Sequence, residues 1–148
     1  MATEGRPRHP VGLFDAHAKA VFLAAQQDAE RRGAKFLVSG LVLHAAATAG
    51  DQFSAALLGL IGVDLDALDA AVDAEWDAGS HRLQDQPPTL LNQAFQAVAA
   101  AAPPRMELDL ASLLVEILAY PDSMATRVVR RVGADPNRVA EELRRVSQ

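Results

Sequence analysis

The sequence lacks cysteine, has few aromatic residues and carries only a moderate excess of negative charge. Without cysteine the chain can form neither a disulfide framework nor a thiolate metal site, and a thiol nucleophile is excluded. No apolar run approaches the roughly 20 residues that are needed to cross a bilayer. A formal net charge of −5 disfavours general affinity for nucleic acid. We therefore expect a soluble cytoplasmic protein that binds neither membranes nor nucleic acid.

The composition favours helices that pack closely against one another. Half of the residues are apolar, whereas aromatic residues make up 5%. The interior must therefore consist mainly of alanine, leucine and valine, which suits closely packed helices better than a sheet. A chain of 148 residues forms one ordinary domain or two small halves that share a core, and it can bury roughly 68–70% of its unfolded surface. We predict an all-α protein.

A short unit of sequence occurs twice. Gly62-Val63-Asp64 and Gly133-Ala134-Asp135 lie 71 positions apart, and the same offset places Leu57-Leu58 on Val128-Val129. Glycine can adopt the left-handed conformation that ends a helix, and the aspartate can cap the next one. In the second copy Pro136 follows the aspartate, where proline favours the start of a helix. Each copy therefore predicts two helices that meet at a tight turn.

Apolar spacing and turn residues together predict eight helices. Helices two and six have almost no polar face, which is typical of helices at the centre of a fold. The sixth helix follows a capping position at Asp109. The predicted helices cover residues 13–32, 39–49, 52–60, 65–76, 89–102, 110–118, 123–132 and 136–146.

These elements divide the chain into two tandem four-helix repeats with pseudo-two-fold symmetry. Residues 1–12 read as a flexible tail and residues 13–76 as the first repeat. Residues 77–87 belong to a polar stretch that ends in the proline pair Pro87-Pro88 and read as a linker, and residues 88–148 form the second repeat. We expect helices two and six to build the core and the binding surface to be a groove where the two halves meet.

An ordered set of sequence features follows this division. In the first repeat it comprises Phe14, Ala18 and Val21, Arg31-Arg32-Gly33, Ser39-Gly40-Leu41-Val42-Leu43 and Gly62-Val63-Asp64. In the second repeat it comprises Leu113-Leu114, the helix over 122–132 and Gly133-Ala134-Asp135-Pro136-Asn137-Arg138-Val139. Over residues 13–146 this set resembles the double repeat of the Clp amino-terminal domain. That module stands at the front of ClpA- and ClpC-type AAA+ unfoldases and also occurs as a stand-alone protein.

The resemblance implies a non-catalytic binding module rather than an enzyme, with no cofactor and no metal. In the family this domain receives adaptors and substrate segments, so the implied partners are protein or peptide segments, Clp adaptors, Clp subunits or damaged proteins. ClpC-type members bind phosphorylated arginine through a threonine near the start of each repeat and a glutamate at the start of each second helix. The threonine positions correspond here to Asp15 and Thr89, and the candidate binding residues are Phe14, Asp15 and Thr89.

The two glutamate positions of that pattern fall on Gly40 and Ala111. A guanidinium group is held best by a carboxylate partner, because charge-assisted pairs are the strong ones. The sequence therefore does not predict phosphoarginine recognition in the manner of the family, and Thr89 also reads as a plain helix cap.

The ATPase part of such unfoldases is absent from these residues. No Gly-x-x-x-x-Gly-Lys-[Ser/Thr] motif occurs, and Gly33-Ala34-Lys35 lacks the preceding strand and the glycine spacing that cradle phosphates. Either a stand-alone relative or a piece of a longer unfoldase agrees with this pattern, and the sequence favours the former.

Other charged and titratable groups have weaker functional interpretations. The four histidines have no second histidine at a metal-binding spacing, which leaves surface or core roles. An acidic edge on helix four could attract a basic partner or form a solvated face. Arginines on the last two helices could form a charged face or a helix-turn-helix DNA reader, but the acidic first copy shares the same turn. These sets are His9, His17, His44 and His81; Asp64, Asp66, Asp69, Asp73 and Asp77; and Arg127, Arg130, Arg131, Arg138, Arg144 and Arg145.

The sequence therefore predicts a module that binds protein segments and modulates Clp-dependent proteolysis, for example by competing with the unfoldase's own front domain. The alternative is a helical scaffold that assembles with itself or with a regulator and has no link to proteolysis.

Overall fold

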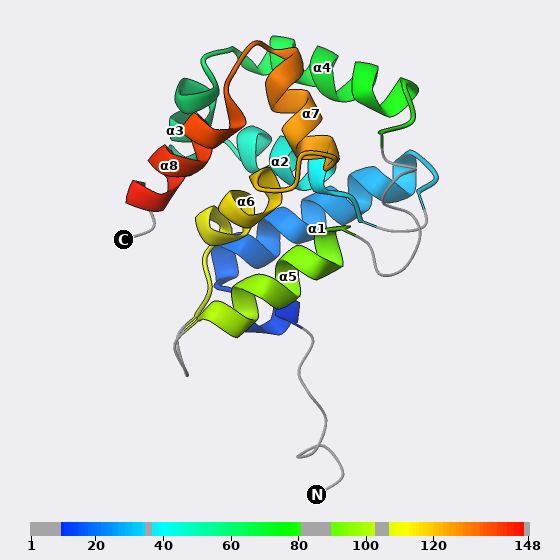
Figure 1. The fold of residues 1–148 in the computed structure, drawn as a ribbon. Coiled ribbons are helices and arrows are strands. Elements are labelled where there is room, and N and C mark those ends of the chain that lie inside the picture. Colours follow the sequence, from blue (N-terminus) through cyan, green and yellow to red (C-terminus); the bar gives the residue numbers. More distant parts are fainter. Residues whose placement is uncertain (1–9, 35–36, 81–89, 103–106, 147–148) are drawn as a thin grey trace, which may run out of the picture.

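A computed structural model describes residues 10–34, 37–80, 90–102 and 107–146. Within these ranges the chain forms eight α-helices and one short 3-10 helix, and the all-α class is confirmed (Figure 1). The elements are η1 (Pro10–Leu13), α1 (Ala16–Arg31), α2 (Ser39–Thr48), α3 (Gln52–Ile61), α4 (Leu65–Asp77), α5 (Leu90–Ala101), α6 (Leu110–Leu118), α7 (Met124–Arg131) and α8 (Pro136–Val146).

Aspartate residues are the N-caps of four of the described helices. Each accepts a hydrogen bond from the backbone N–H three residues further on, which satisfies a donor that has no partner within the helix. The capping residues are Asp15 for α1, Asp51 for α3, Asp64 for α4 and Asp109 for α6. The cap at Asp15 explains why the first predicted helix, 13–32, is divided between η1 and α1.

The two glycine turns that were predicted from the repeated unit are present. Gly62 ends α3 with φ +84° and Gly133 follows α7 with φ +89°. Both angles lie in the left-handed region, where a Cβ is unfavourable. The α3–α4 and α7–α8 pairs therefore each turn at a glycine, as the sequence indicates.

The helices α2 and α6 lie at the centre of the molecule, which confirms the prediction from their apolar sequences (Figure 1). The helix α2 packs against α1, α3, α4 and α7, and α6 packs against α5, α7 and α8. Because α7 touches both central helices, the described helices share one core. Three edge-to-face phenylalanine rings, Phe14, Phe22 and Phe95, add to that core with centroid distances of 5.2–5.6 Å.

Corresponding helices keep the 71-residue offset seen in the sequence. Helices α2 and α6 begin at residues 39 and 110, and α4 and α8 begin at residues 65 and 136. The two four-helix sets are therefore in register along the chain. Their relation by a pseudo-two-fold axis, and the division into repeats, stay predictions.

Two of the proposed segment boundaries fall inside or at the end of a described helix. The proposed tail, 1–12, runs into η1, and the proposed linker, 77–87, begins at the last residue of α4. Residues 1–9 and 81–87 lie outside the described residues, as does the predicted first residue of helix five, Thr89.

One close approach between the halves is made by α2 and α7. A Cβ added to Gly40 would lie 2.5 Å from Cγ and 2.6 Å from Sδ of Met124. The Met124 side chain therefore fills the space that a side chain at position 40 would need. Beside this contact the buried hydroxyl oxygen of Ser39 accepts a hydrogen bond of 3.1 Å from the backbone N–H of Ala125. A serine of the first half thus satisfies a free N–H in the first turn of α7.

A second link joins the beginning of the chain to the segment before α6. The backbone N–H of Leu108 donates to the carbonyl of Leu13, and the N–H of Asp15 donates to the carbonyl of Leu108, each at 2.9 Å. This pair of bonds forms an isolated parallel bridge between Phe14 and Leu108. These bonds hold the residues just before α1 against the residues just before α6.

A third link is the ion pair between Glu75 of α4 and Arg131 of α7. One carboxylate oxygen of Glu75 accepts bonds of 3.0 and 2.7 Å from Arg131, and the other accepts a bond of 2.8 Å from Ser80. Glu75 is only 6% exposed. Burial acts to raise its pKa, but the bonds from Arg131 and Ser80 and the positive charges of Arg131 and Arg127 outweigh burial and lower the pKa of Glu75.

We predict that Gly40→Ala destabilises the protein by about 1–3 kcal/mol, because the added methyl group overpacks the contact with Met124. Urea unfolding measures the change. Gly59→Ala is the matched control: Gly59 lies inside α3 with nothing within 4 Å of the added Cβ, so this change gains up to about 1 kcal/mol of helix propensity. Equal or higher stability of the Gly40 variant would contradict the close approach.

We predict that Glu75→Gln lowers the free energy of unfolding at pH 7 by about 1–3 kcal/mol, because Arg131 loses its charged partner. Since the pKa of Glu75 is lowered in the folded state, the stabilisation exists above the ordinary glutamate pKa of about 4.3 and disappears as the pH falls through the folded value. The difference between wild type and variant should therefore shrink in acid.

Urea unfolding between pH 7 and pH 3 measures this dependence. The control is Glu142→Gln, which breaks the exposed pair with Arg145 and should change stability by less than about 0.5 kcal/mol. A Glu75 difference that stays constant with pH would contradict the assignment.

Candidate functional site

The sequence-predicted binding residues do not form an accessible cluster within the described structure. Phe14 is 1% exposed and packs on Phe22 and Phe95 in the core. Asp15 is partly buried, and its carboxylate accepts a bond of 2.8 Å from the N–H of Ala18. Thr89 lies outside the described residues. Phe14 therefore packs in the core just before α1 and does not form part of the surface. Asp15 is the N-cap of α1.

The two positions where the resemblance would place glutamates are also interior. Gly40 is buried against Met124, and Ala111 is 3% exposed. A glutamate at position 40 would need the space that the Met124 side chain fills. The absence of carboxylates there follows from the packing of α2 and α6 in the core.

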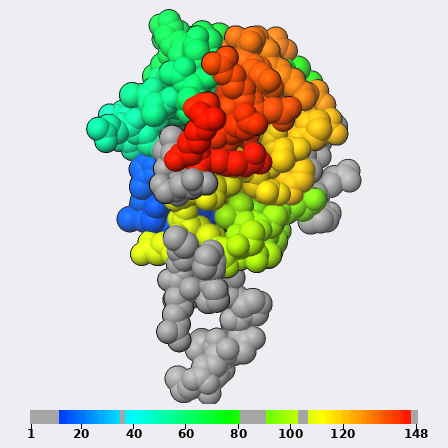
Figure 2. Space-filling model, turned by 60° about the vertical axis from the view of Figure 1, so that its left-hand side comes forward, coloured from blue at the N-terminus to red at the C-terminus, as the bar shows by residue number. Residues whose placement is uncertain are grey.

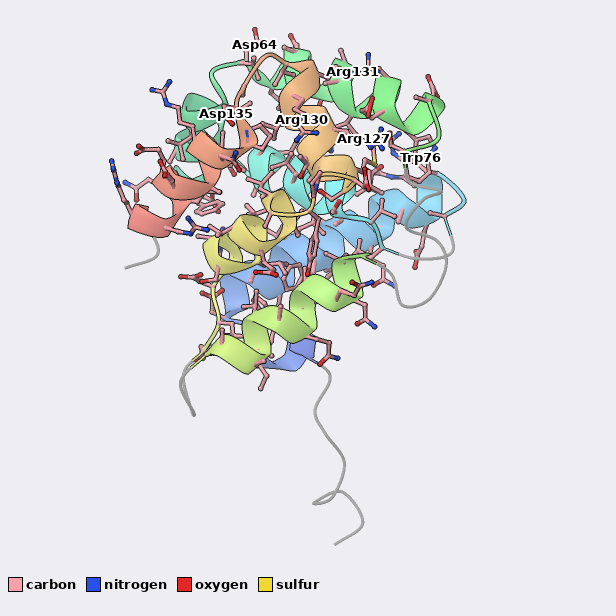
Figure 3. All side chains as sticks on the ribbon, viewed as in Figure 1. Asp64, Trp76, Arg127, Arg130, Arg131 and Asp135 are labelled. Atoms are coloured by element: carbon pink, nitrogen blue, oxygen red, sulfur yellow. The ribbon has the colours of Figure 1, made fainter. Side chains whose placement is uncertain are left out.

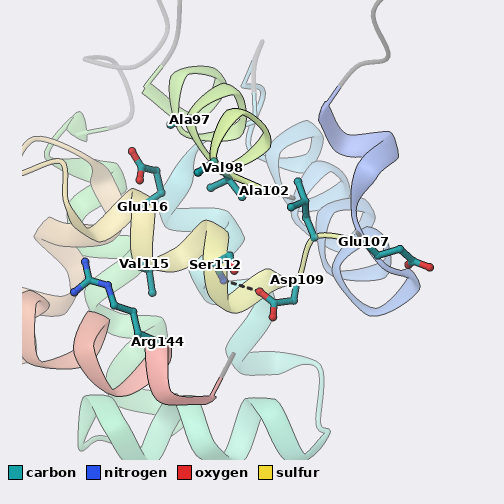
Figure 4. A pocket seen from close by; sticks show the side chains of 11 residues that line it. Ala97, Val98, Ala102, Glu107, Asp109, Ser112, Val115, Glu116 and Arg144 are labelled. Carbon is teal, nitrogen blue, oxygen red and sulfur yellow. Dashed lines mark hydrogen bonds between the residues drawn. The ribbon is translucent and has the colours of Figure 1, made fainter. Parts of the chain in front are cut away.

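The described surface carries a hollow between α5 and α6 with a volume of about 350 Å³ (Figure 4). Its floor is mainly apolar, and its rim carries carboxylates and one guanidinium group. The lining residues are Ala97, Val98, Ala101 and Ala102 of α5, Glu107, Leu108 and Asp109 before α6, Ser112, Val115 and Glu116 of α6, and Arg144 of α8.

A second hollow of about 360 Å³ lies between α6 and α8. Val115 and Arg144 line both hollows, so the two are adjacent along the outer side of α6. We call them together the α6 groove. The second hollow is lined by Val115, Leu118, Ala119, Asn137, Ala140, Glu141 and Arg144.

Helical spacing produces the side of α6 that faces this groove. Val115, Glu116 and Ala119 follow Ser112 by three, four and seven residues, so the four residues lie on one face. The opposite face carries buried residues such as Leu113 and Leu114. The helix α8, which forms one wall, lies at the surface and contacts α3 and α6 (Figure 2).

Both hollows are lined by residues of the second half alone. The predicted groove at the junction of the halves is a different place, and it stays a prediction. Sequence reasoning missed the α6 groove because the apolar sequence of helix six indicated burial on all sides. The usable signal was the polar or small residue at 112, 116 and 119 around Val115.

The arginines of α7 and α8 are partly neutralised by carboxylates of the same chain. The three arginines of α7, Arg127, Arg130 and Arg131, are labelled in Figure 3. Arg131 pairs with Glu75, Arg127 lies 3.5 Å from Asp122, and Arg145 lies 3.2 Å from Glu142. Such pairs reduce the positive charge that phosphate groups would meet, which favours a charged face over a DNA reader.

The described histidines have carboxylate partners rather than a metal-binding arrangement. His17 contacts Asp51 at 2.9 Å, and His44 lies between Asp28 and Asp69. Across the described ranges, no three His, Asp or Glu side chains are arranged to hold a metal ion. Nor is any helix in those ranges long and apolar enough to span a membrane.

Neither a protein-family model nor a curated protein matches this sequence. The resemblance to the Clp amino-terminal domain thus rests on the ordered turns and helices described above.

We predict that Asp15→Ala costs about 1 kcal/mol of stability, because α1 loses its cap. Asp15→Asn retains a side-chain acceptor and should cost less than half as much. Thermal unfolding measures both changes, with the exposed, non-capping Asp66→Ala on α4 as the control. Equal stability of Asp15→Ala and wild type would contradict the role as a cap.

Proposed function

We propose that this protein is a non-catalytic module that binds protein segments in the manner of the Clp amino-terminal domain and modulates Clp-dependent proteolysis. The observation that carries the proposal is the order of eight helices in two sets, each with a glycine turn before its last helix and with a 71-residue offset between α2 and α6 and between α4 and α8. This is the architecture that the resemblance implies.

The character of the described surface supports the proposal. The hollow between α5 and α6 is mainly apolar and the hollow between α6 and α8 is more polar, so the α6 groove offers both kinds of contact through which a protein holds and orients a short segment. The described carboxylates, arginines and histidines discussed above mostly serve as helix caps or ion-pair partners.

The alternative function is a self-assembling helical scaffold. The observation in its favour is Leu23 on α1, a large apolar residue that is 61% exposed. Single exposed apolar residues are common on monomers, and interfaces need a contiguous patch. We therefore place the binding module first.

We predict that the purified chain slows degradation of fluorescent casein by a ClpC or ClpA unfoldase with its protease, because it competes for segments that the unfoldase's front domain receives. The rate should fall in proportion to the occupancy of the competing chain and recover when casein is in excess. An unfoldase that lacks its front domain is the comparison: inhibition that persists with it means that the chain sequesters casein, and inhibition that disappears means that the chain competes at the front domain. An unchanged rate at every concentration, together with sedimentation of the chain as a large assembly, would favour the scaffold.

A further inference from the structure

The two central helices have the same position in their sets but different surroundings on their outer sides. The helix α2 lies beside α1 and α4, and α6 lies beside α5 and α8. The helices α2 and α6, like α4 and α8, begin 71 residues apart. Residues at this offset can therefore be compared one with another.

In the first half, polar side chains close the space above α2. The Nε2 atom of His44 is hydrogen-bonded to Asp69 of α4, and its Nδ1 atom lies 3.8 Å from Asp28 of α1. Arg32, the residue that follows α1, donates a bond of 2.9 Å to Asp73 of α4, and its guanidinium group lies 5.2 Å from the centre of the Trp76 ring. These contacts join α1 to α4 across α2.

In the second half the corresponding positions are different in kind. The offset places Val115 at the position of His44, Ala140 at that of Asp69 and Arg144 at that of Asp73. A valine and an alanine cannot form the ion pair that spans α2. Val115 and Arg144 instead line both hollows of the α6 groove. The groove therefore lies at the place in the second half that corresponds to the ion pairs of His44 in the first half.

The rim of the α6 groove has an excess of negative charge. The lining residues include four carboxylates and one guanidinium group, between which the floor is formed by alanine, valine and leucine. Such a site attracts cationic groups at its edge and excludes water from its floor. The four carboxylates belong to Glu107, Asp109, Glu116 and Glu141.

We propose that the α6 groove binds a short segment of another protein in which apolar side chains are flanked by arginine or lysine. The inference rests on the proposed function and names its site and the chemistry of its partner. Each hollow, at about 350–360 Å³, lies near the lower end of the range for binding pockets, which suits individual side chains. A second copy of this chain is disfavoured as the occupant, because the net charge of −5 repels it from an acidic rim.

The probe is a fluorescein-labelled 12-residue peptide with two leucines four residues apart and arginines on both sides of them. Two companion peptides replace the arginines with glutamates or the leucines with serines. Amide NMR shifts of the intact chain locate the binding site, and fluorescence anisotropy gives the affinity. We expect shifts concentrated on residues 97–102, 107–119 and 137–144, and binding at least about tenfold weaker for either companion.

Two variants test the groove with matched controls. Ala119→Arg places a long side chain in the second hollow at an exposed helix end, where a cation suits the helix dipole. Its control is Thr48→Arg, the position 71 residues earlier at the end of α2. We expect Ala119→Arg to weaken binding about tenfold and Thr48→Arg to leave it unchanged.

The double variant Glu107→Lys/Glu141→Lys tests the rim, because both residues are exposed. It should weaken the arginine peptide about fivefold or more and make its binding less sensitive to salt. The control Glu30→Lys/Asp77→Lys makes the same change of charge away from the groove and should have no such effect.

Several outcomes would overturn the inference. Equal binding of the arginine and glutamate peptides, or an equal effect of Thr48→Arg and Ala119→Arg, would exclude the α6 groove as the site. Groove shifts that appear on concentrating the chain alone would identify a second copy as the occupant. If the casein assay responds while no probe peptide shifts the groove, the site is wrong and the proposed function stands. If a probe peptide shifts the groove while the casein assay does not respond, the site stands and the proposed function is wrong.

Discussion

The contact between α2 and α7 is the constraint on which the rest of the structure depends. The backbone at Gly40 lies so close to Met124 that a Cβ would clash with its side chain. Beside it, the Ser39 hydroxyl oxygen accepts a hydrogen bond from the backbone N–H of Ala125. Because α7 also contacts α4 and α6, this single approach joins a helix of the second set to the centre of the first. Interiors packed at crystal-like density tolerate little change in volume, so any side chain at position 40 requires the buried Met124 side chain to move.

The same constraint explains why charge is placed where it is. Glu75 and Arg131 meet where α4 and α7 pack together, and the carboxylate is buried only because the guanidinium and Ser80 satisfy it. A buried carboxylate without such partners would be strongly destabilising. The ion pair therefore fixes the relative position of the two helices more than it adds stability, whereas exposed pairs such as Arg145 with Glu142 contribute little.

Sequence reasoning located the helices well because the signals were local. Aspartate caps, left-handed glycines and apolar spacing depend on residues that lie close together in the sequence, and Asp64 with Gly62 illustrates the first two. The binding site was harder to predict because burial depends on distant packing. Phe14 looked like an exposed contact near the start of a repeat, but Phe22 and Phe95 enclose it. The α6 groove arises from α5, α6 and α8 together, and no single segment reveals it.

In the proposed binding module, the second set of helices would hold the partner and the first set would support it, because the two sets are stabilised differently. The first set has ion pairs around His44 that join α4 to α1 over α2. The second set has Val115 at the equivalent place, and its neighbours leave two hollows beside the same helix position. Because both central helices are anchored through α7, a partner in the α6 groove would contact a surface that the other half already holds in place. Preorganisation of this kind lowers the ordering cost of binding, which is the physical reason to look for the partner on the second set.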